Sequence, residues 1–159
     1  METKMKNFIG TKLIKARPCT HGDFEKEMEA MEIKPSMIDT EGYLVEYKDG
    51  YSSWSPKAAF EDAYMELIVN PELATEEPSI SQEMVDDFIV DYDVFTKKNK
   101  ITIVIATLRN GFTIVESSAC VSPENYNESM GYEICKKRIE NKVWNHLGFL
   151  LQTAIKSIK

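Results

Sequence analysis

Regular alternation of hydrophobic and polar residues occupies two stretches of the chain, and a polar segment separates them. The segment NPELATEEPSI (70–80) holds two prolines and three glutamates and shows little periodicity, which is typical of a linker. We therefore expect a small N-terminal α+β module (1–69), a linker (70–80) and a second module (81–159).

The hydrophobic pattern of the N-terminal module predicts a strand followed by a helix. GTKLIKARP (10–18) predicts a strand that stops at proline, because proline has no N–H for a sheet ladder. HGDFEKEMEAMEI (21–33) predicts a short helix. Two aromatic and β-branched runs around Asp49-Gly50 then predict a β-hairpin with a type I′ turn.

A second helix is expected to follow the hairpin. Ser55 suits its N-cap, and Pro56 suits its first position. Apolar residues recur at helical spacing and predict a core-facing stripe made of Ala59, Phe60, Ala63, Tyr64 and Leu67.

The second module has the pattern of a helix, three strands and a long helix. SQEMVDDFIVDY (81–92) predicts an amphipathic, acidic helix. A three-stranded meander follows, with turns near Lys98-Asn99 and at Asn110-Gly111, two residues that tolerate positive φ. ITIVIATL (101–108) is nearly all apolar or β-branched, which suits the central strand. The last helix should run from Asn127 or Glu128 to about Ile158.

These patterns together indicate the α+β class. We expect a C-terminal antiparallel three-stranded meander flanked by two helices, preceded by the small αβ module that contains the β-hairpin. The last helix is long for a small domain, so part of it is expected to extend into a partner subunit.

Charge and composition exclude several classes of protein. A net charge of −7 argues against a partner that is a nucleic-acid polymer. No apolar run approaches the ~18 residues of a membrane-spanning helix. Three cysteines without a paired spacing favour reduced thiols in a cytoplasm.

Residues suited to catalysis or metal binding are scattered. The two histidines, His21 and His146, lie in different modules, and a surface role suits each better than that of a general base. Cys120 and Cys135 are expected to be buried small hydrophobes. No spacing of His, Cys or carboxylate residues resembles a metal site. We expect no enzymatic activity, no metal and no cofactor.

A ligand-binding junction is a stronger expectation. Successive small polar residues at a strand end let a ligand approach the backbone, and free N–H groups before a helix favour phosphate. An arginine fork can hold two phosphate oxygens, and an exposed aromatic ring can stack on a base. The candidate contacts are Arg109, Asn110, Phe112, Ser117, Ser118, Asn125, Arg138 and Lys142.

Plainer interpretations stay open for the same residues. Asn110 and Gly111 can serve the hairpin alone. Arg138 and Lys142 can belong to a solvated helix face with intrahelical ion pairs.

LRNGFTIVESSACVSPENYNESMG (108–131) followed by KVWNHLGFLL (142–151) resembles a small phage protein family, the first-type Thoeris anti-defence proteins. The similarity covers about residues 83–151. Members of that family have a β-sheet flanked by two long helices. The resemblance implies tight, non-hydrolytic capture of glycocyclic ADP-ribose, and cyclic oligonucleotides for some members. It also implies a homo-oligomer, either a dimer or a hexamer, acting in the cytoplasm of an infected bacterial host.

The first module is similar to a short phage accessory module through GTKLIKARPCTHGDFEKE (10–27) and EGYLVEYKDGYSSWSPKAAFEDAY (41–64). Two departures from the family patterns concern specificity. CTHGDF (19–24) stands where the first module has MTRGEY, and HLGF (146–149) stands where the second has LEGY. The alternative function is a protein-interaction module, which predicts that Trp144 and Phe149 are exposed.

Overall fold

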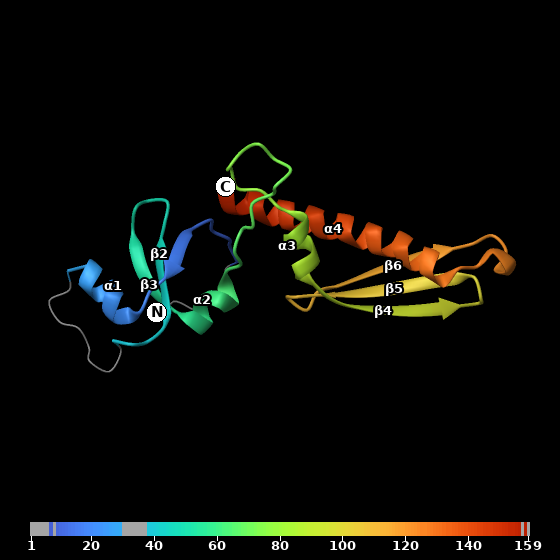
Figure 1. Cartoon of the computed structure of the whole chain (residues 1–159), viewed down its shortest axis with the longest axis horizontal. Coiled ribbons are helices and arrows are strands. Elements are labelled where there is room, and N and C mark those ends of the chain that lie inside the picture. The colour runs from blue at the N-terminus through green and yellow to red at the C-terminus, as the bar shows by residue number, and fades with distance from the viewer. Residues whose placement is uncertain (1–6, 8, 30–37, 157, 159) are drawn as a thin grey trace, which may run out of the picture. The chain divides into compact units, whose positions relative to one another are not determined.

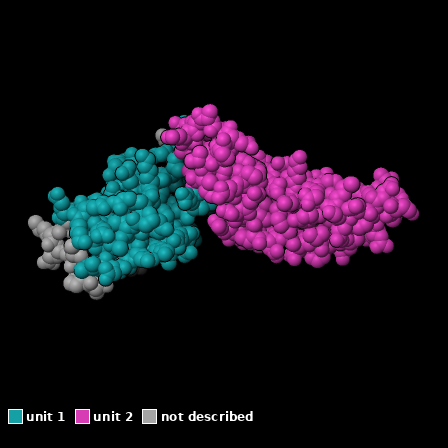
Figure 2. All heavy atoms as spheres, viewed as in Figure 1, with its two compact units in different colours: residues 1–66, 153–159 teal, residues 67–152 magenta. Residues whose placement is uncertain are grey.

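A computed structural model describes residues 7, 9–29, 38–156 and 158. The chain forms two compact units: residues 1–66 with 153–159 (unit 1), and residues 67–152 (unit 2), as Figure 2 shows. Each unit contains a three-stranded antiparallel sheet, which confirms the α+β class. Across the described residues, every helix is too short or too polar to pass through a lipid bilayer.

Unit 1 has the order strand, helix, hairpin, helix that the pattern predicts (Figure 1). The sheet order is β1-β2-β3. The strand predicted at 10–18 ends at Pro18 as expected but begins only at Lys15, where pairing with Glu46 starts. The helix predicted at 21–33 is α1, which ends at Glu27; residues 30–33 of that prediction lie outside the described part. The elements are β1 Lys15–Pro18, α1 His21–Glu27, β2 Gly42–Glu46, β3 Ser52–Pro56 and α2 Lys57–Ala63.

The predicted start of the second helix is wrong by one residue. Pro56, not Ser55, occupies the N-cap of α2, and no side chain caps the helix. The reason is tertiary: β3 continues through Pro56, which pairs with Gly42, so Ser55 remains in the strand.

The predicted core-facing stripe on this helix is also wrong. Within α2, no residue is buried, and Ala59 and Ala63 are exposed. The helix ends at Ala63, so Tyr64 and Leu67 lie beyond it. Aromatic packing replaces the stripe, because the Phe60 ring stacks on Tyr43 at 4.0 Å and on Tyr64 at 5.0 Å between centroids.

Unit 2 is a β-meander with a long helix along one face of the sheet (Figure 1). The predicted meander and the predicted start of the long helix near Glu128 are confirmed. The elements are α3 Gln82–Phe88, β4 Ile89–Lys97, β5 Ile101–Leu108, β6 Thr113–Ala119, the 3-10 turn η2 Pro123–Asn125 and α4 Glu128–Lys156.

The first helix of unit 2 is shorter than predicted. Ser81 caps α3, because its hydroxyl accepts the Met84 N–H at 3.3 Å. The helix stops at Phe88, since Ile89 pairs with Leu108 of β5, so residues 89–92 are strand.

The polar segment 70–80 has its ends tied by a hydrogen bond from Asn70 Nδ2 to the Ile80 carbonyl (3.1 Å). Its role as a linker stays a prediction.

The hairpin turns have two geometries, and one turn differs from the type that was predicted. Lys98 and Asn99 both have φ of 52°, the positive values that a type I′ turn requires at its two central residues. At Asp49-Gly50 and Asn110-Gly111, only the glycine has a positive φ, 83° and 81° respectively. In both hairpins three residues form the loop, and a single left-handed glycine closes it. The type I′ turn predicted at Asp49-Gly50 is therefore wrong.

The core of unit 2 lies between β5 and α4. Buried and half-buried residues alternate along β5, and the buried set is Thr102, Val104, Ala106 and Leu108. The buried residues of α4 recur every fourth position, at Gly131, Cys135, Ile139, Val143 and Leu147. Two matching apolar rows, one of strand period and one of helix period, therefore hold helix and sheet together.

The other face of this sheet is partly exposed and carries both apolar and polar residues. Strand pairing puts Phe95, Ile103 and Ser117 in one cross-strand row, and Asp93, Ile105 and Val115 in the next. Phe95 and Val115 are exposed, whereas Ile103 and Ile105 are half-buried. This surface is called the open face below.

Candidate functional site

The eight predicted contact residues fall into three places in unit 2. Arg109, Asn110 and Phe112 lie at the β5–β6 turn, and Asn125 lies in η2. The structure brings only one subset together, on β6 and the middle of α4: Ser117, Ser118, Arg138 and Lys142.

Several N–H groups at the start of α4 already have partners within the chain. The Asn125 N–H donates to the Ser122 carbonyl, and the Tyr126 N–H donates to the Pro123 carbonyl, both at 3.0 Å. The Asn127 side-chain oxygen accepts the Met130 N–H at 2.9 Å. Local turn and capping bonds therefore use the N–H groups of Asn125, Tyr126 and Met130, and a phosphate at this helix start stays a prediction.

Glu116 organises the cations on α4. Its carboxylate lies 2.5 Å from Lys142 Nζ and 3.9 Å from Arg138 Nη1. The Glu116 side chain is only 15% exposed, whereas those of Arg138 and Lys142 are about half exposed. One carboxylate between two cations leaves a formal charge of +1. These two pairs join helix to strand, whereas Lys136 forms an intrahelical pair of the plainer interpretation with Glu140 at 3.8 Å.

Arg138 is also fixed by the edge of the sheet. Its Nη1 donates to the Ser117 carbonyl at 2.9 Å, on the strand that forms one edge. A guanidinium has five N–H groups, so others remain for a ligand. The Ser117 and Ser118 side chains cannot serve one ligand from the same side, because successive strand residues face opposite ways. Ser118 shares its row with buried Thr102 and Ser117 with Ile103.

Phe112 and His146 extend this cluster toward the β5–β6 turn. Their ring centroids are 5.8 Å apart, and Phe112 is 55% exposed. Arg138, Lys142 and His146 are four residues apart, so they share one face of α4 over about 12 Å. We call these three residues the α4 polar row. His146 was missed as a candidate, although its i+4 spacing from Lys142 was a usable signal.

The turn residues have structural roles in this arrangement. The Asn110 side-chain oxygen accepts the Phe112 N–H at 3.0 Å, which stabilises the loop. The Arg109 N–H donates to the Phe88 carbonyl at 2.9 Å, which ties the turn to α3.

Tyrosine hydroxyls gather on the same side of the sheet as α4. The Tyr126 hydroxyl lies 2.7 Å from Thr96 Oγ1 and 3.1 Å from Thr102 Oγ1. Burial, and then the negative charge of Glu140, raises the pKa of Tyr92 to about 12. Tyr92 is therefore neutral at physiological pH.

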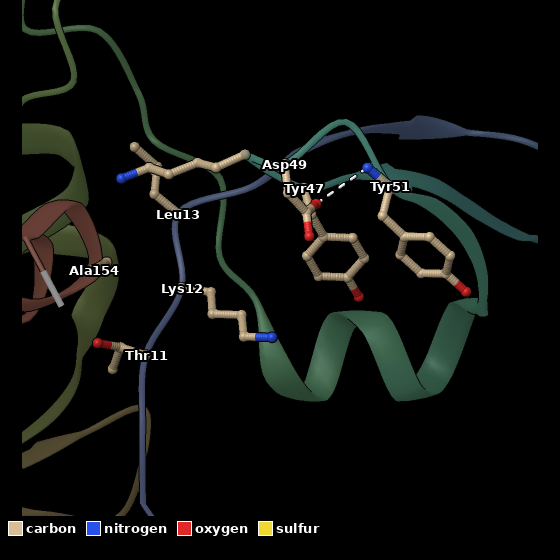
Figure 3. A pocket seen from close by; sticks show the side chains of 8 residues that line it. Thr11, Lys12, Leu13, Tyr47, Asp49, Tyr51 and Ala154 are labelled. Atoms are coloured by element: carbon tan, nitrogen blue, oxygen red, sulfur yellow. Dashed lines mark hydrogen bonds between the residues drawn. The ribbon is translucent and has the colours of Figure 1, made fainter. Parts of the chain in front are cut away.

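Unit 1 contains a hollow that the sequence did not indicate. Its cavity is about 450 Å³ (Figure 3). The hairpin contributes Tyr47 and Tyr51, and the segment before β1 contributes Lys12. Aromatic residues on both sides of the Asp49-Gly50 turn were the available signal. The lining is Thr11, Lys12, Leu13, Tyr47, Lys48, Asp49, Tyr51 and Ala154.

Comparison with known proteins finds a family that is similar to residues 80–155. No curated protein sequence and no solved structure matches the chain. Residues 80–155, from the residue before the α3 cap to the end of α4, match a phage protein family. This stretch, slightly less than half of the chain, is similar to the phage protein (N4 Gp49/phage Sf6 gene 66) family.

Proposed function

We propose that this chain is a phage anti-defence protein that binds nucleotide immune signals and sequesters them without cleavage. Glycocyclic ADP-ribose is the expected ligand, with cyclic oligonucleotides as further candidates, and the cytoplasm of the infected bacterium is the expected place of action. The phage family over residues 80–155 and the resemblance of residues 108–151 to Thoeris anti-defence proteins support this proposal. The structural observation that carries it is the α4 polar row beside β6.

The α4 polar row and its neighbours offer both kinds of contact that a nucleotide needs. Arg138 and Lys142 supply charge-assisted donors for phosphate oxygens. Phe112 and His146 supply rings on which a base can stack. Because the row extends over about 12 Å, phosphates and base can be held at its two ends.

Preorganisation is what makes capture feasible without reaction chemistry. Sub-nanomolar binding corresponds to more than ~12 kcal/mol. Such affinity requires side chains that are already held in place. The Ser117 carbonyl fixes Arg138, and Glu116 fixes Lys142. A phosphate has to displace Glu116 from a cation, so weak anions are expected to be excluded.

Capture and release of intact ligand test the proposal directly. The purified protein is incubated with glycocyclic ADP-ribose, separated from free ligand, and heated; we expect the unchanged nucleotide to be recovered. The double substitution Arg138→Ala/Lys142→Ala should weaken binding at least about tenfold, since each lost charge-assisted bond costs about 1.5–3 kcal/mol. Titration calorimetry measures the affinity.

The neighbouring lysine provides the matched control. Lys137 is exposed on α4 but does not belong to the α4 polar row, so Lys137→Ala should leave the affinity unchanged. Recovery of a cleaved product would show that the protein hydrolyses the ligand, and it would contradict the proposal of capture without cleavage. If the wild type and the double variant bound the ligand with equal affinity, the α4 polar row would not be part of the binding site.

We also propose that the chain is a homo-oligomer, a dimer or a hexamer. β4 is an edge strand, with Asp91 and Asp93 near its start and Lys97 at its end on the open face. In a two-fold antiparallel pairing of two β4 strands, the acidic start of one meets the basic end of the other. Light scattering should give a mass at least twice the 18.2 kDa of one chain. The Asp91→Lys substitution should lower that mass, and a monomeric wild type would contradict the proposal.

A protein-interaction module is the second candidate, and exposed apolar residues favour it. Phe149 is 76% exposed, and Phe95 and Val115 are exposed on the open face. Trp144 is only half-buried, and its Nε1 donates to Gln82 Oε1 at 3.2 Å. The capture experiment separates the two functions, because an interaction module retains no nucleotide.

A further inference from the structure

The hollow in unit 1 combines an aromatic platform with two ammonium groups. The Tyr47 and Tyr51 rings are stacked with centroids 5.9 Å apart at an angle of 28°. Figure 3 shows the two rings side by side with their hydroxyls pointing the same way, and Lys12 reaching toward Tyr47. Lys12 Nζ lies 5.2 Å from the centre of the Tyr47 ring. Stacking surface and positive charge therefore lie within one side-chain length of each other.

The platform is held in place from inside the unit. Tyr47 is half-buried and lies close enough to Tyr64 to help raise the pKa of that phenol, although burial is the larger cause. Tyr64 in turn stacks on Phe60 of α2. Tyr51 is 65% exposed, so one ring of the pair is fixed and the other is accessible. A ligand ring can stack there at little cost in ordering the protein.

The charges of the hollow favour an anion. Lys48 Nζ donates to the Ile155 carbonyl at 2.7 Å, which uses one of its three N–H groups. Asp49 is the carboxylate among the lining residues, and its Oδ1 accepts the Tyr51 N–H at 3.1 Å. Two ammonium groups against one carboxylate leave a formal charge of +1. The cation–π contact of Lys12 is worth only about 0.5–1 kcal/mol at an exposed site, so a phosphate can displace it.

We propose that this hollow binds a nucleoside phosphate, with the base stacked on Tyr51 and Tyr47 and the phosphate held by Lys12 and Lys48. The proposal concerns unit 1 alone and does not depend on capture by the α4 polar row. A cavity of about 450 Å³ falls in the usual range for small-molecule sites. The net charge of −7 disfavours a nucleic-acid polymer as the occupant.

Adenosine monophosphate is the probe that tests this site. Calorimetric titration of the full chain should show saturable binding that survives in the Arg138→Ala/Lys142→Ala variant, since that variant leaves unit 1 intact. Lys12→Gln and Tyr51→Leu should each weaken binding at least about tenfold. Tyr51→Phe should retain it, because the stacking ring remains. Lys15→Gln, an exposed lysine on β1 outside the hollow, is the matched control and should have no effect.

Two further ligands test the stacking contact and the phosphate contact separately. Adenosine and inorganic phosphate should each bind at least about tenfold more weakly than adenosine monophosphate, because each lacks half of the recognition. If Lys12→Gln and Tyr51→Leu left the affinity unchanged, that result would overturn the proposal. So would loss of binding in Arg138→Ala/Lys142→Ala, or a clear preference for a single-stranded oligonucleotide. Circular dichroism of the variants checks that unit 1 remains folded.

Discussion

Replacing Ile139 by alanine is expected to lower the free energy of unfolding of unit 2 by about 2–5 kcal/mol. Ile139 is completely buried at the centre of the α4 row that packs on β5. The substitution removes apolar surface from a close-packed interior and leaves a cavity, and both effects destabilise the folded state. Urea denaturation, with hydrogen exchange of the β5 amides as a local readout, measures the loss.

Ile134 provides the matched control on the same helix. It is 39% exposed, so Ile134→Ala removes an identical group from a partly solvated position. We expect a cost below about 1 kcal/mol, because surface substitutions usually change stability little. Similar losses for the two variants would contradict the assignment of the core to one face of α4.

The second large effect is expected at Gly131, where α4 lies against Thr102 of β5. A Cβ added there would overlap Thr102 Oγ1 and would lie 2.8 Å from Thr102 Cβ. Thr102 is completely buried, and its β-branched side chain has little freedom to turn away. Gly131→Ala should therefore destabilise unit 2 by about 1–3 kcal/mol, even though alanine is the better helix former. A urea denaturation series measures the change.

Gly148 on the same helix shows what alanine does without the close contact. Nothing lies within 4 Å of a Cβ built at that position, and no positive φ opposes the substitution. Gly148→Ala should stabilise the helix by up to about 1 kcal/mol. Thr102→Ala should reduce the cost of Gly131→Ala, which a double-mutant cycle reveals. Additive effects of these two substitutions would show that the predicted overlap does not determine the cost.

Local sequence signals predicted much of the fold, because they act over a few residues. The helix predicted from Ser81 begins at Gln82 with Ser81 as its cap, and the apolar, β-branched run ITIVIATL (101–108) forms the central strand β5. The left-handed glycines at Gly50 and Gly111 lie where the turn pairs indicated them. The turn types could not be read in the same way, since loop length depends on how the two strands pair.

Element ends and burial depended on distant partners. β3 holds Ser55 in a strand, so the helix start moved to Pro56 and Lys57. Ile134 and Ile139 look alike in a hydrophobic pattern, yet only Ile139 is buried against the sheet.

The candidate sites show the same division between what local sequence predicted and what distant partners decided. Sequence alone selected Arg138, Lys142 and Phe112 by chemistry, and the expected likeness of the second module to phage proteins agrees with the family match over residues 80–155. Only the tertiary structure paired Lys142 with Glu116 and Arg138 with the Ser117 carbonyl, and only it brought Lys12 to Tyr47. The physical reason is distance along the chain. Residues more than 20 positions apart meet only when sheet register and helix rotation are set, and the packed core of each unit sets them.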